Sequence, residues 1–247
     1  MPLRDLLPWD PRFYERSPLF EPLTPLARRF SGDTHFPSIA RWNEVLGDGL
    51  TVRFQAQRPL PRGQRRHQTP RQPYSSSIQL ESVVPSRPAS WHDFFNALVW
   101  GTFVEAKRAL HARQHAAFSS WAALDPTRLP NRRTRELDAL ALLDEGGVIV
   151  LTDAHPTTGM DAAELESTGH ARVLVFGHAI YESLMLREAP PACRASAVTV
   201  RVDRLPGNPG ALLEAADRGL ATLLADGQAF QGPTPQPGLR LCLLPAP

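Results

Sequence analysis

The segment that most constrains this chain runs from Ser90 to Val104 and reads SWHDFFNALVWGTFV. At about 100° per residue, its apolar side chains point in nearly every direction around a helix. A helix without a polar face is buried, so the rest of the chain must enclose it. The helical pattern continues beyond this segment, and Ser90 is a suitable N-cap residue. The sequence therefore predicts a central buried helix at about residues 91–117.

Three polar residues, His92, Asp93 and Asn96, stand at the start of this apolar segment. His92 and Asn96 are one turn apart and face the same side. Burying an unpaired amide costs roughly 1–3 kcal/mol, so an enclosed Asn96 needs partners. In a structural interpretation, Asp93 satisfies free N–H groups of the first turn and Asn96 bonds a neighbouring loop. In a functional interpretation, the helix start is the floor of a polar pocket, with His92 as acid/base or metal ligand and Asn96 orienting a substrate.

Lys107, His111 and His115 follow at four-residue spacing along the predicted helix. In one continuous helix, Lys107 would lie about 16 Å from Asn96 along the axis. We therefore expect Lys107 to be out of reach of a small ligand at His92. The row is expected to face solvent and to complement the helix dipole. A metal site at His111 and His115 is the alternative, but a third nearby ligand is missing.

A second candidate region surrounds His178, which follows the β-prone run 172–176 and Gly177 at the start of a predicted helix over 178–187. Gly177 allows a sharp turn, and the first turn of a helix exposes N–H groups that suit anions. Glu182 lies one turn further on, where it can reach His178. His178 is either a satisfied histidine at a strand–helix junction or a second member of the proposed pocket.

Further polar candidates are Arg135, Asp138, Asp144 and Glu145. Residues 140–144 and 148–152 flank the sequence EGG, which favours a β-hairpin. A helix over 133–143 is the competing interpretation. On a hairpin these residues would be solvated, whereas as a carboxylate cluster they could hold a hard cation such as Mg²⁺, with Arg135 as an anion clamp.

The prolines divide the chain into two regions. Of the 25 prolines, 13 fall within residues 1–89, where only short helices at 19–30 and 39–46 and a strand at 50–57 are expected. Residues 58–73 contain five arginines and no acid. They favour a flexible solvated loop over a phosphate-binding arm, because no aromatic residue is interleaved to stack on bases.

The second region mixes helices and strands without regular βαβ alternation. Strands are expected at 197–202 and 239–244 and a helix at 210–225. We predict a single α+β domain over 1–247, with a Pro/Arg-rich N-terminal region at 1–89 and an α+β core at 90–247. In that core the central helix would pack on a small, largely antiparallel sheet.

Charge and hydropathy narrow the range of partners. The net charge of +2 is too small to indicate a nucleic-acid or membrane partner by itself. No run approaches the roughly 18 apolar residues of a membrane span. The start MPLRDLLPWD has a charge and prolines where a signal peptide needs an apolar stretch. We expect a soluble cytoplasmic protein for which a small molecule is a candidate partner and nucleic acid is not expected. The sequence alone does not decide whether a metal or a cofactor is bound, and both are left as unknown.

Four segments carry a family resemblance: VRFQAQ, VVPSRPASWHDFFNALVWGTFVEAKRAL, LLDEGGVIVL and VLVFGHAIYESL. Together they resemble a bacterial family known as domain of unknown function 3025, over roughly residues 40–190. The resemblance implies that the helix around His92 and the segment around His178 belong to one domain, and it implies no activity. Val104 stands where a proline is usual in that family. Ser75 stands where an acidic residue is usual, so a site that uses this acid would be weakened here.

Two hypotheses about function follow. In the first, the chain is an enzyme or small-ligand binder whose pocket gathers His92, Asp93, Asn96 and His178, with Arg135, Asp138 or Asp144 contributing. In the second, it is a non-enzymatic interaction protein that uses the arginine-rich arm 58–71 on an acidic partner or nucleic acid.

Overall fold

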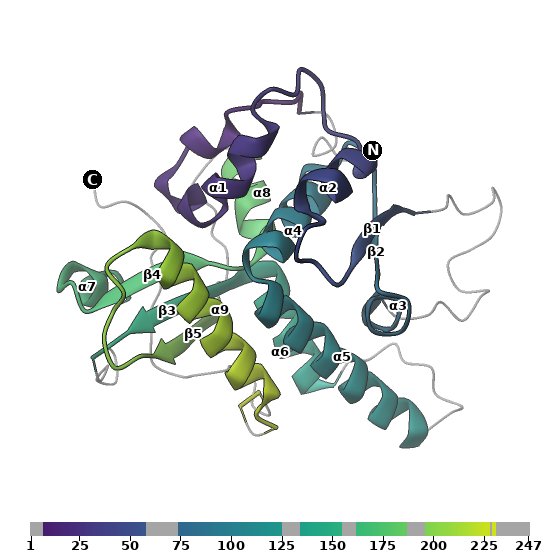
Figure 1. The fold of residues 1–247 in the computed structure, drawn as a ribbon. Helices are drawn as coiled ribbons and strands as arrows, with labels where there is room; N and C mark the ends of the chain where they lie inside the picture. Colours follow the sequence, from purple (N-terminus) through teal and green to yellow (C-terminus); the bar gives the residue numbers. More distant parts are fainter. Residues whose placement is uncertain are drawn as a thin grey trace.

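A computed structural model describes residues 7–57, 74–124, 134–154, 162–186, 196–227 and 229–230. The fold is α+β, as predicted, with helices around two small sheets (Figure 1). Among the described helices, none has both the length and the apolar character that a membrane crossing requires. The predicted loop 58–73 and the predicted strand 239–244 lie outside the described residues.

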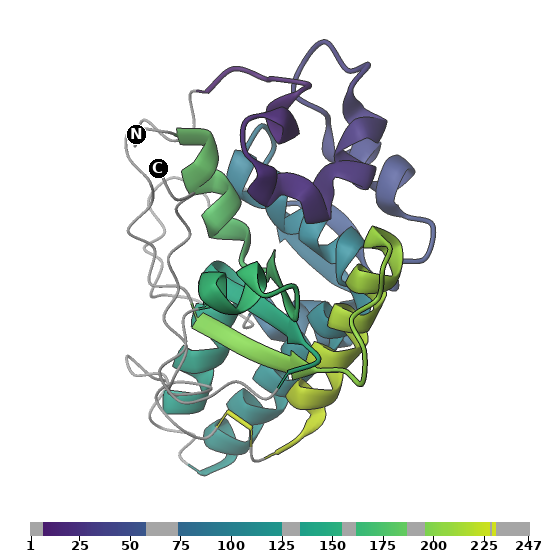
Figure 2. The same cartoon turned by 90° about the vertical axis from the view of Figure 1, so that its left-hand side faces the viewer.

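The N-terminal region forms only short elements, as predicted, and some of them contain prolines. The elements are η2 (Phe13–Glu15), η3 (Pro18–Leu23), α1 (Thr24–Ala27), η4 (Arg28–Phe30), α2 (Ile39–Leu46) and β1 (Arg53–Ala56). Aromatic side chains of this region pack on the next one: Trp9 stacks on Trp91 at 5.1 Å, and Phe13 meets Phe95 edge-on at 5.4 Å. Figures 1 and 2 show these helices at one end of the molecule and the far end of α5 at the other. The hydrophobic core thus includes residues of both regions.

The predicted central helix is two helices, α4 (Trp91–Thr102) and α5 (Val104–Leu124). The chain leaves helical geometry at Phe103, with φ −121° and ψ 64°. The prediction of one continuous helix over 91–117 is therefore wrong. The new helix is capped from elsewhere, because Asp217 accepts hydrogen bonds from the backbone N–H groups of Glu105 and Ala106 at 3.1 and 2.7 Å. This tertiary contact has no local sequence signal.

The segment predicted as a β-hairpin is a helix followed by a strand, namely α6 (Arg135–Gly146) and β3 (Gly147–Thr152). The competing helical interpretation is correct. Thr134 caps α6 by accepting from the Leu137 N–H at 3.2 Å. All six residues of β3 are buried. A central strand that is covered on both faces is apolar throughout and does not show the alternation of apolar and polar residues that marks a half-buried strand.

The remaining elements are α3 (Tyr74–Glu81), β2 (Val83–Ser86), α7 (Ala162–Ser167), β4 (Ala171–Val175), α8 (His178–Leu186), β5 (Ser196–Arg201) and α9 (Pro209–Ala225). Four of these seven elements were predicted, and α3, β2 and α7 were not. The predicted strands at 172–176 and 197–202 and the helices at 178–187 and 210–225 are confirmed within one or two residues at the described ends.

The sheets are not largely antiparallel. In the three-stranded sheet, of order β4-β3-β5, the central β3 is antiparallel to β4 but parallel to β5. A parallel neighbour requires a crossover connection, and the chain between β3 and β5 includes β4 and α8. The second sheet pairs β1 and β2 in parallel. Helices α1, α2, α5 and α8 pack around α4, whereas α9 packs on β3 and β5.

Candidate metal centre

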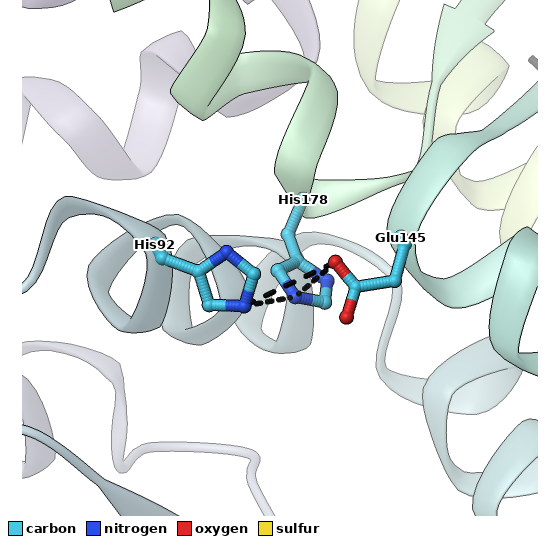
Figure 3. Close-up of side chains that lie close together, drawn as sticks. All are labelled: His92, Glu145 and His178. Atoms are coloured by element: carbon cyan, nitrogen blue, oxygen red, sulfur yellow. Dashed lines mark hydrogen bonds and ion pairs between the residues drawn. The ribbon is translucent and has the colours of Figure 1, made fainter. Parts of the chain in front are cut away.

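Three side chains from three helices meet at one point: His92 from α4, Glu145 from α6 and His178 from α8 (Figure 3). His92 and His178 stand in the first turns of their helices, and Glu145 stands in the last turn of α6. One nitrogen of each imidazole and one carboxylate oxygen lie within 4.8 Å of one another. The cluster is therefore built from helix ends that converge.

The start of α4 is held by two polar side chains beside His92. Ser90 accepts a hydrogen bond from the Asp93 N–H at 3.4 Å, as the capping pattern predicted. The Asp93 carboxylate accepts from the Arg87 backbone N–H at 2.5 Å and from the Arg87 guanidinium at 3.0 Å through each oxygen. Asp93 thus anchors the preceding loop and is not one of the three clustered side chains.

A close backbone approach brings His178 to the end of α6. The Gly177 N–H donates to the Gly147 carbonyl at 2.8 Å. A Cβ at position 177 would meet the Glu145 carbonyl oxygen at 2.5 Å and the Gly146 Cα at 2.6 Å. Only glycine fits this junction without a shift of the backbone. Gly177 therefore lets His178 begin α8 directly against the residues that carry Glu145.

The two histidines face each other through their Nε2 atoms, which are 3.1 Å apart. The Glu145 carboxylate lies 3.5 Å from His178 Nε2 and 4.0 Å from His92 Nε2. The other nitrogens are engaged: His178 Nδ1 lies 2.8 Å from the Asp144 carbonyl oxygen, and His92 Nδ1 lies 3.0 Å from the Glu182 carboxylate. We had expected Glu182 to reach His178, but it bonds His92 instead.

These contacts determine where the protons lie. The Asp144 carbonyl can only accept, so His178 Nδ1 carries a proton and, in the neutral ring, Nε2 carries a lone pair. His92 Nδ1 likewise donates to Glu182. The two Nε2 atoms can then lie 3.1 Å apart in one of two ways. Either His92 is an imidazolium that donates to His178, or a cation lies between the two lone pairs.

Burial and neighbouring charges treat the two histidines differently. Burial lowers the pKa of His178 to about 3, so this ring is neutral at physiological pH. Burial also acts to lower the pKa of His92, but the hydrogen bond to Glu182 and the charge of Glu145 outweigh it and raise that pKa above its usual value. The pKa of Glu145 is raised, chiefly by burial. His92 is therefore the protonated ring of the metal-free pair.

A buried charge network adjoins the cluster, and it includes Lys107, which we expected to be remote and solvated. Lys107 is fully buried and donates to the Asp144 carboxylate at 2.5 Å and to Asn96 Oδ1 at 2.8 Å. That prediction is wrong: the chain breaks at Phe103 instead of continuing as one helix, and the Lys107 ammonium group reaches the Asn96 side chain directly. Asn96, only 7% exposed, also donates to the Tyr74 hydroxyl at 2.9 Å, so the enclosed amide has the partners that its burial requires.

The rest of the predicted basic row is also not solvated. His111 is fully buried, with Nδ1 2.9 Å from Gln114 Oε1 and its ring stacked on Trp100 at 5.2 Å. His115 is partly buried, with Nδ1 3.1 Å from Ser76 Oγ. His111 and His115 are absent from the one group of three or more metal-binding side chains that the described residues contain.

Arg135 and Asp138 lie exposed in the first turns of α6, whereas Asp144 and Glu145 lie near its end. About ten residues of helix, or roughly 15 Å, separate Arg135 from Glu145. The structure therefore does not bring Arg135 and Asp138 to the histidines. Asp144 does lie beside them, and its carbonyl orients His178 while its carboxylate pairs with Lys107.

Glu145 was one of the further polar candidates, but it was not assigned to the proposed pocket because the hairpin interpretation placed it in a solvated turn. The competing helix over 133–143 ended two residues before it. Tyr74 was not a candidate and had no sequence signal, since its contact with Asn96 joins residues 22 positions apart.

Comparison with sequence families identifies a match over residues 62–241, described as protein of unknown function (DUF3025). The chain belongs to this family. His92, Glu145, His178 and Glu182 all lie within the matched range of this family member. No curated protein and no solved structure matches it.

Two imidazoles and one carboxylate form a donor set that suits zinc and ferrous iron better than Mg²⁺, which prefers oxygen ligands. Both imidazoles have a hydrogen-bond acceptor behind them, the arrangement that fixes the orientation of histidine ligands at metal sites. Side chains of His92 and Glu145 are 25% and 51% exposed, so solvent reaches the cluster, whereas His178 is only 4% exposed. An ion bound here would keep open positions on its solvent side.

Proposed function

We propose that this chain is a metal-dependent hydrolytic enzyme in which His92 Nε2, His178 Nε2 and Glu145 hold one zinc ion. The observation that carries the proposal is the pair of Nε2 atoms 3.1 Å apart, each with its Nδ1 already committed to an acceptor. Two lone pairs that face each other at this distance repel, and a divalent cation removes that repulsion. In its absence, a proton on His92 does the same.

Zinc is favoured because Glu182 stands behind His92, which makes a carboxylate–histidine pair of the kind that orients zinc ligands. Three protein ligands leave a position for water, and zinc lowers the pKa of bound water to about 7. The protein would supply a hydroxide nucleophile at neutral pH. Asn96 and Asp144 act behind this site as positioning groups, through Tyr74 and His178 respectively.

The experiment is a zinc titration of chelator-treated protein, followed by a zinc-dependent assay with an activated ester such as p-nitrophenyl acetate. We expect one zinc per chain in the wild type. In Glu145→Ala and His92→Ala we expect zinc affinity to fall by about 10- to 100-fold, and ester hydrolysis to fall with it. His170→Ala is the matched control, because this histidine is 63% exposed and pairs with Asp153.

Glu145→Ala removes a half-exposed side chain, so a folded variant is expected, and circular dichroism checks this. The proposal fails if the wild type does not bind zinc at micromolar concentration. It also fails if the folded variants bind zinc as well as the control does. The alternative function, an arginine-rich arm at 58–71 that binds an acidic partner, concerns residues outside those described and stays a prediction from the sequence.

A further inference from the structure

A chain of hydrogen bonds leads from the metal cluster to the Tyr74 hydroxyl. It begins at Asp144, next to Glu145, and passes through Lys107 and Asn96. An ammonium group can only donate, so Lys107 must face the Asn96 oxygen, and the Asn96 NH₂ must face Tyr74. The tyrosine oxygen therefore accepts, at 2.9 Å, and its own proton is left to point elsewhere.

The Tyr74 proton has no acceptor among the hydrogen bonds found within the described ranges of the chain. Burial around the hydroxyl raises the pKa of Tyr74, and the negative charge of Asp144 raises it further, so the phenol stays protonated at every physiological pH. The residue as a whole is nevertheless 38% exposed. Tyr74 therefore offers a fixed, neutral hydrogen-bond donor at the surface of the buried network.

The hydroxyl lies beside the metal cluster. Asn96, which bonds it, is one turn beyond His92 on the same face of α4, and side chains four residues apart on a helix are about 6 Å apart. The negative charges of Asp144, Asp93 and Glu145 all act to raise the pKa of this hydroxyl. A small molecule bound at the cluster would be within reach of Tyr74.

The charges around the cluster disfavour an anionic substrate. Lys107 is paired with Asp144, and Arg87 is paired with Asp93. A zinc ion with Glu145 as ligand and Glu182 behind His92 would bring two positive and two negative charges. The loaded site is then close to neutral, and Lys107 and Arg87 already pair with carboxylates. A phosphate or carboxylate group would therefore gain little electrostatic attraction at the loaded site, whereas the binding of a neutral carbonyl group does not depend on such attraction.

We infer that the substrate is a neutral carbonyl compound, an ester or amide, whose carbonyl oxygen accepts a hydrogen bond from the Tyr74 hydroxyl. This inference rests on the proposed function. In the reaction one water is consumed: its oxygen forms a bond to the carbonyl carbon. The bond to the leaving oxygen or nitrogen breaks with its electron pair, and a proton from the water ends on the leaving group. Tyr74 stabilises the negative charge that develops on the carbonyl oxygen.

The test uses acetohydroxamic acid, a carbonyl compound that is uncharged in solution at pH 7 and chelates zinc as acetohydroxamate through its carbonyl and N–O oxygens with loss of one proton, and inorganic phosphate as the anionic probe. Both are titrated into the zinc-loaded full chain and into its Tyr74→Phe variant. We expect Tyr74→Phe to weaken acetohydroxamate binding by about three- to tenfold, the usual effect of one lost hydrogen bond, and to leave zinc affinity unchanged. Wild-type protein should bind phosphate at least about tenfold more weakly than acetohydroxamate. Tyr14→Phe is the matched control.

Tyr74 is partly exposed, so its phenylalanine variant is expected to fold. If the wild type binds zinc but Tyr74→Phe binds acetohydroxamate as tightly as Tyr14→Phe does, the inference is overturned and the metal site stands. Phosphate binding as tight as that of acetohydroxamate also overturns it. If the wild type binds no zinc, the proposed function fails, and this inference fails with it.

Discussion

At the scale of single residues, the pair of Lys107 and Asp144 places two opposite charges inside the protein. The ammonium group is completely enclosed, and the rings of Trp100 and Phe176 lie 5.6 and 5.9 Å from it. The carboxylate keeps its charge, since burial alone would raise the pKa of Asp144 but Lys107 holds it well below the usual value. Each charge is tolerable only because the other is present.

Lys107→Met should therefore destabilise the protein by roughly 3–5 kcal/mol, because it leaves the Asp144 carboxylate buried without its cation. The double variant Lys107→Met with Asp144→Asn should recover part of that loss, since no charge remains unpaired. Urea unfolding of the two single variants and the double variant measures the coupling. If the two single losses simply add in the double variant, the two charges do not stabilise each other.

A second prediction at this scale concerns acid stability. Burial lowers the pKa of His111 to about 4, against about 6.5 in the unfolded chain. Between these values the unfolded chain binds more protons, so stability is fully present above about pH 6.5 and is lost as the pH falls toward 4. The titration of His111 alone should lower the free energy of unfolding by on the order of 2 kcal/mol when the pH falls from 7.5 to 5. Unfolding free energies at both pH values, compared with those of His111→Gln, isolate this part. An equal pH dependence in the variant would refute it.

At the scale of elements, local signals predicted the helices near 39–46, 178–187 and 210–225 and the strands near 172–176 and 197–202, whereas the strand expected at 140–144 is part of α6. The break between α4 and α5 was missed because it depends on a long-range contact. Ser90 and the pattern after it gave the start of α4, but the cap that Asp217 supplies to α5 comes from 112 residues away. Val104 is the first residue of α5, where a proline would have indicated the break, because proline favours the first turn of a helix. Because one continuous helix was predicted, Lys107 was expected to lie too far from Asn96 to contribute to the site. His92 and His178 were chosen together from the sequence, and their rings lie 4.5 Å apart.

The junction between β4 and α8 can be tested through Gly177. In Gly177→Ala the new Cβ would clash with the backbone of Glu145, Gly146 and Gly147, so the start of α8 must move away from the end of α6. That movement separates His178 from the Asp144 carbonyl and from Glu145. We expect zinc affinity to fall by about tenfold or more, with a loss of stability.

Gly207→Ala is the matched control for this substitution, since a Cβ there meets nothing within 4 Å. Both variants are compared by zinc titration and thermal unfolding. Equal zinc affinity in the two would show that the close approach at Gly177 does not position His178.

At the scale of the whole molecule, the candidate metal centre depends on the complete fold. Its two histidines are 86 residues apart in the sequence, and Glu145 comes from a third helix. The helix that carries His92 is in turn enclosed by aromatic residues of the N-terminal region, among them Trp9 and Phe13. An unfolded chain cannot bring the three ligands together, so an ion that binds them binds the native state alone.

Zinc should therefore stabilise the whole protein against unfolding. At a free zinc concentration of 100 times the Kd, the gain is about 2.7 kcal/mol, since only the native state binds. For a chain of this length that corresponds to a rise of roughly 5–10 °C in Tm. The measurement is thermal unfolding with zinc and with excess chelator, for the wild type, Glu145→Ala and His170→Ala. The wild type and His170→Ala should show the rise and lose it on chelation, whereas Glu145→Ala should show little. A rise of the same size in Glu145→Ala would place the stabilising ion elsewhere, because that variant lacks the carboxylate that completes the cluster.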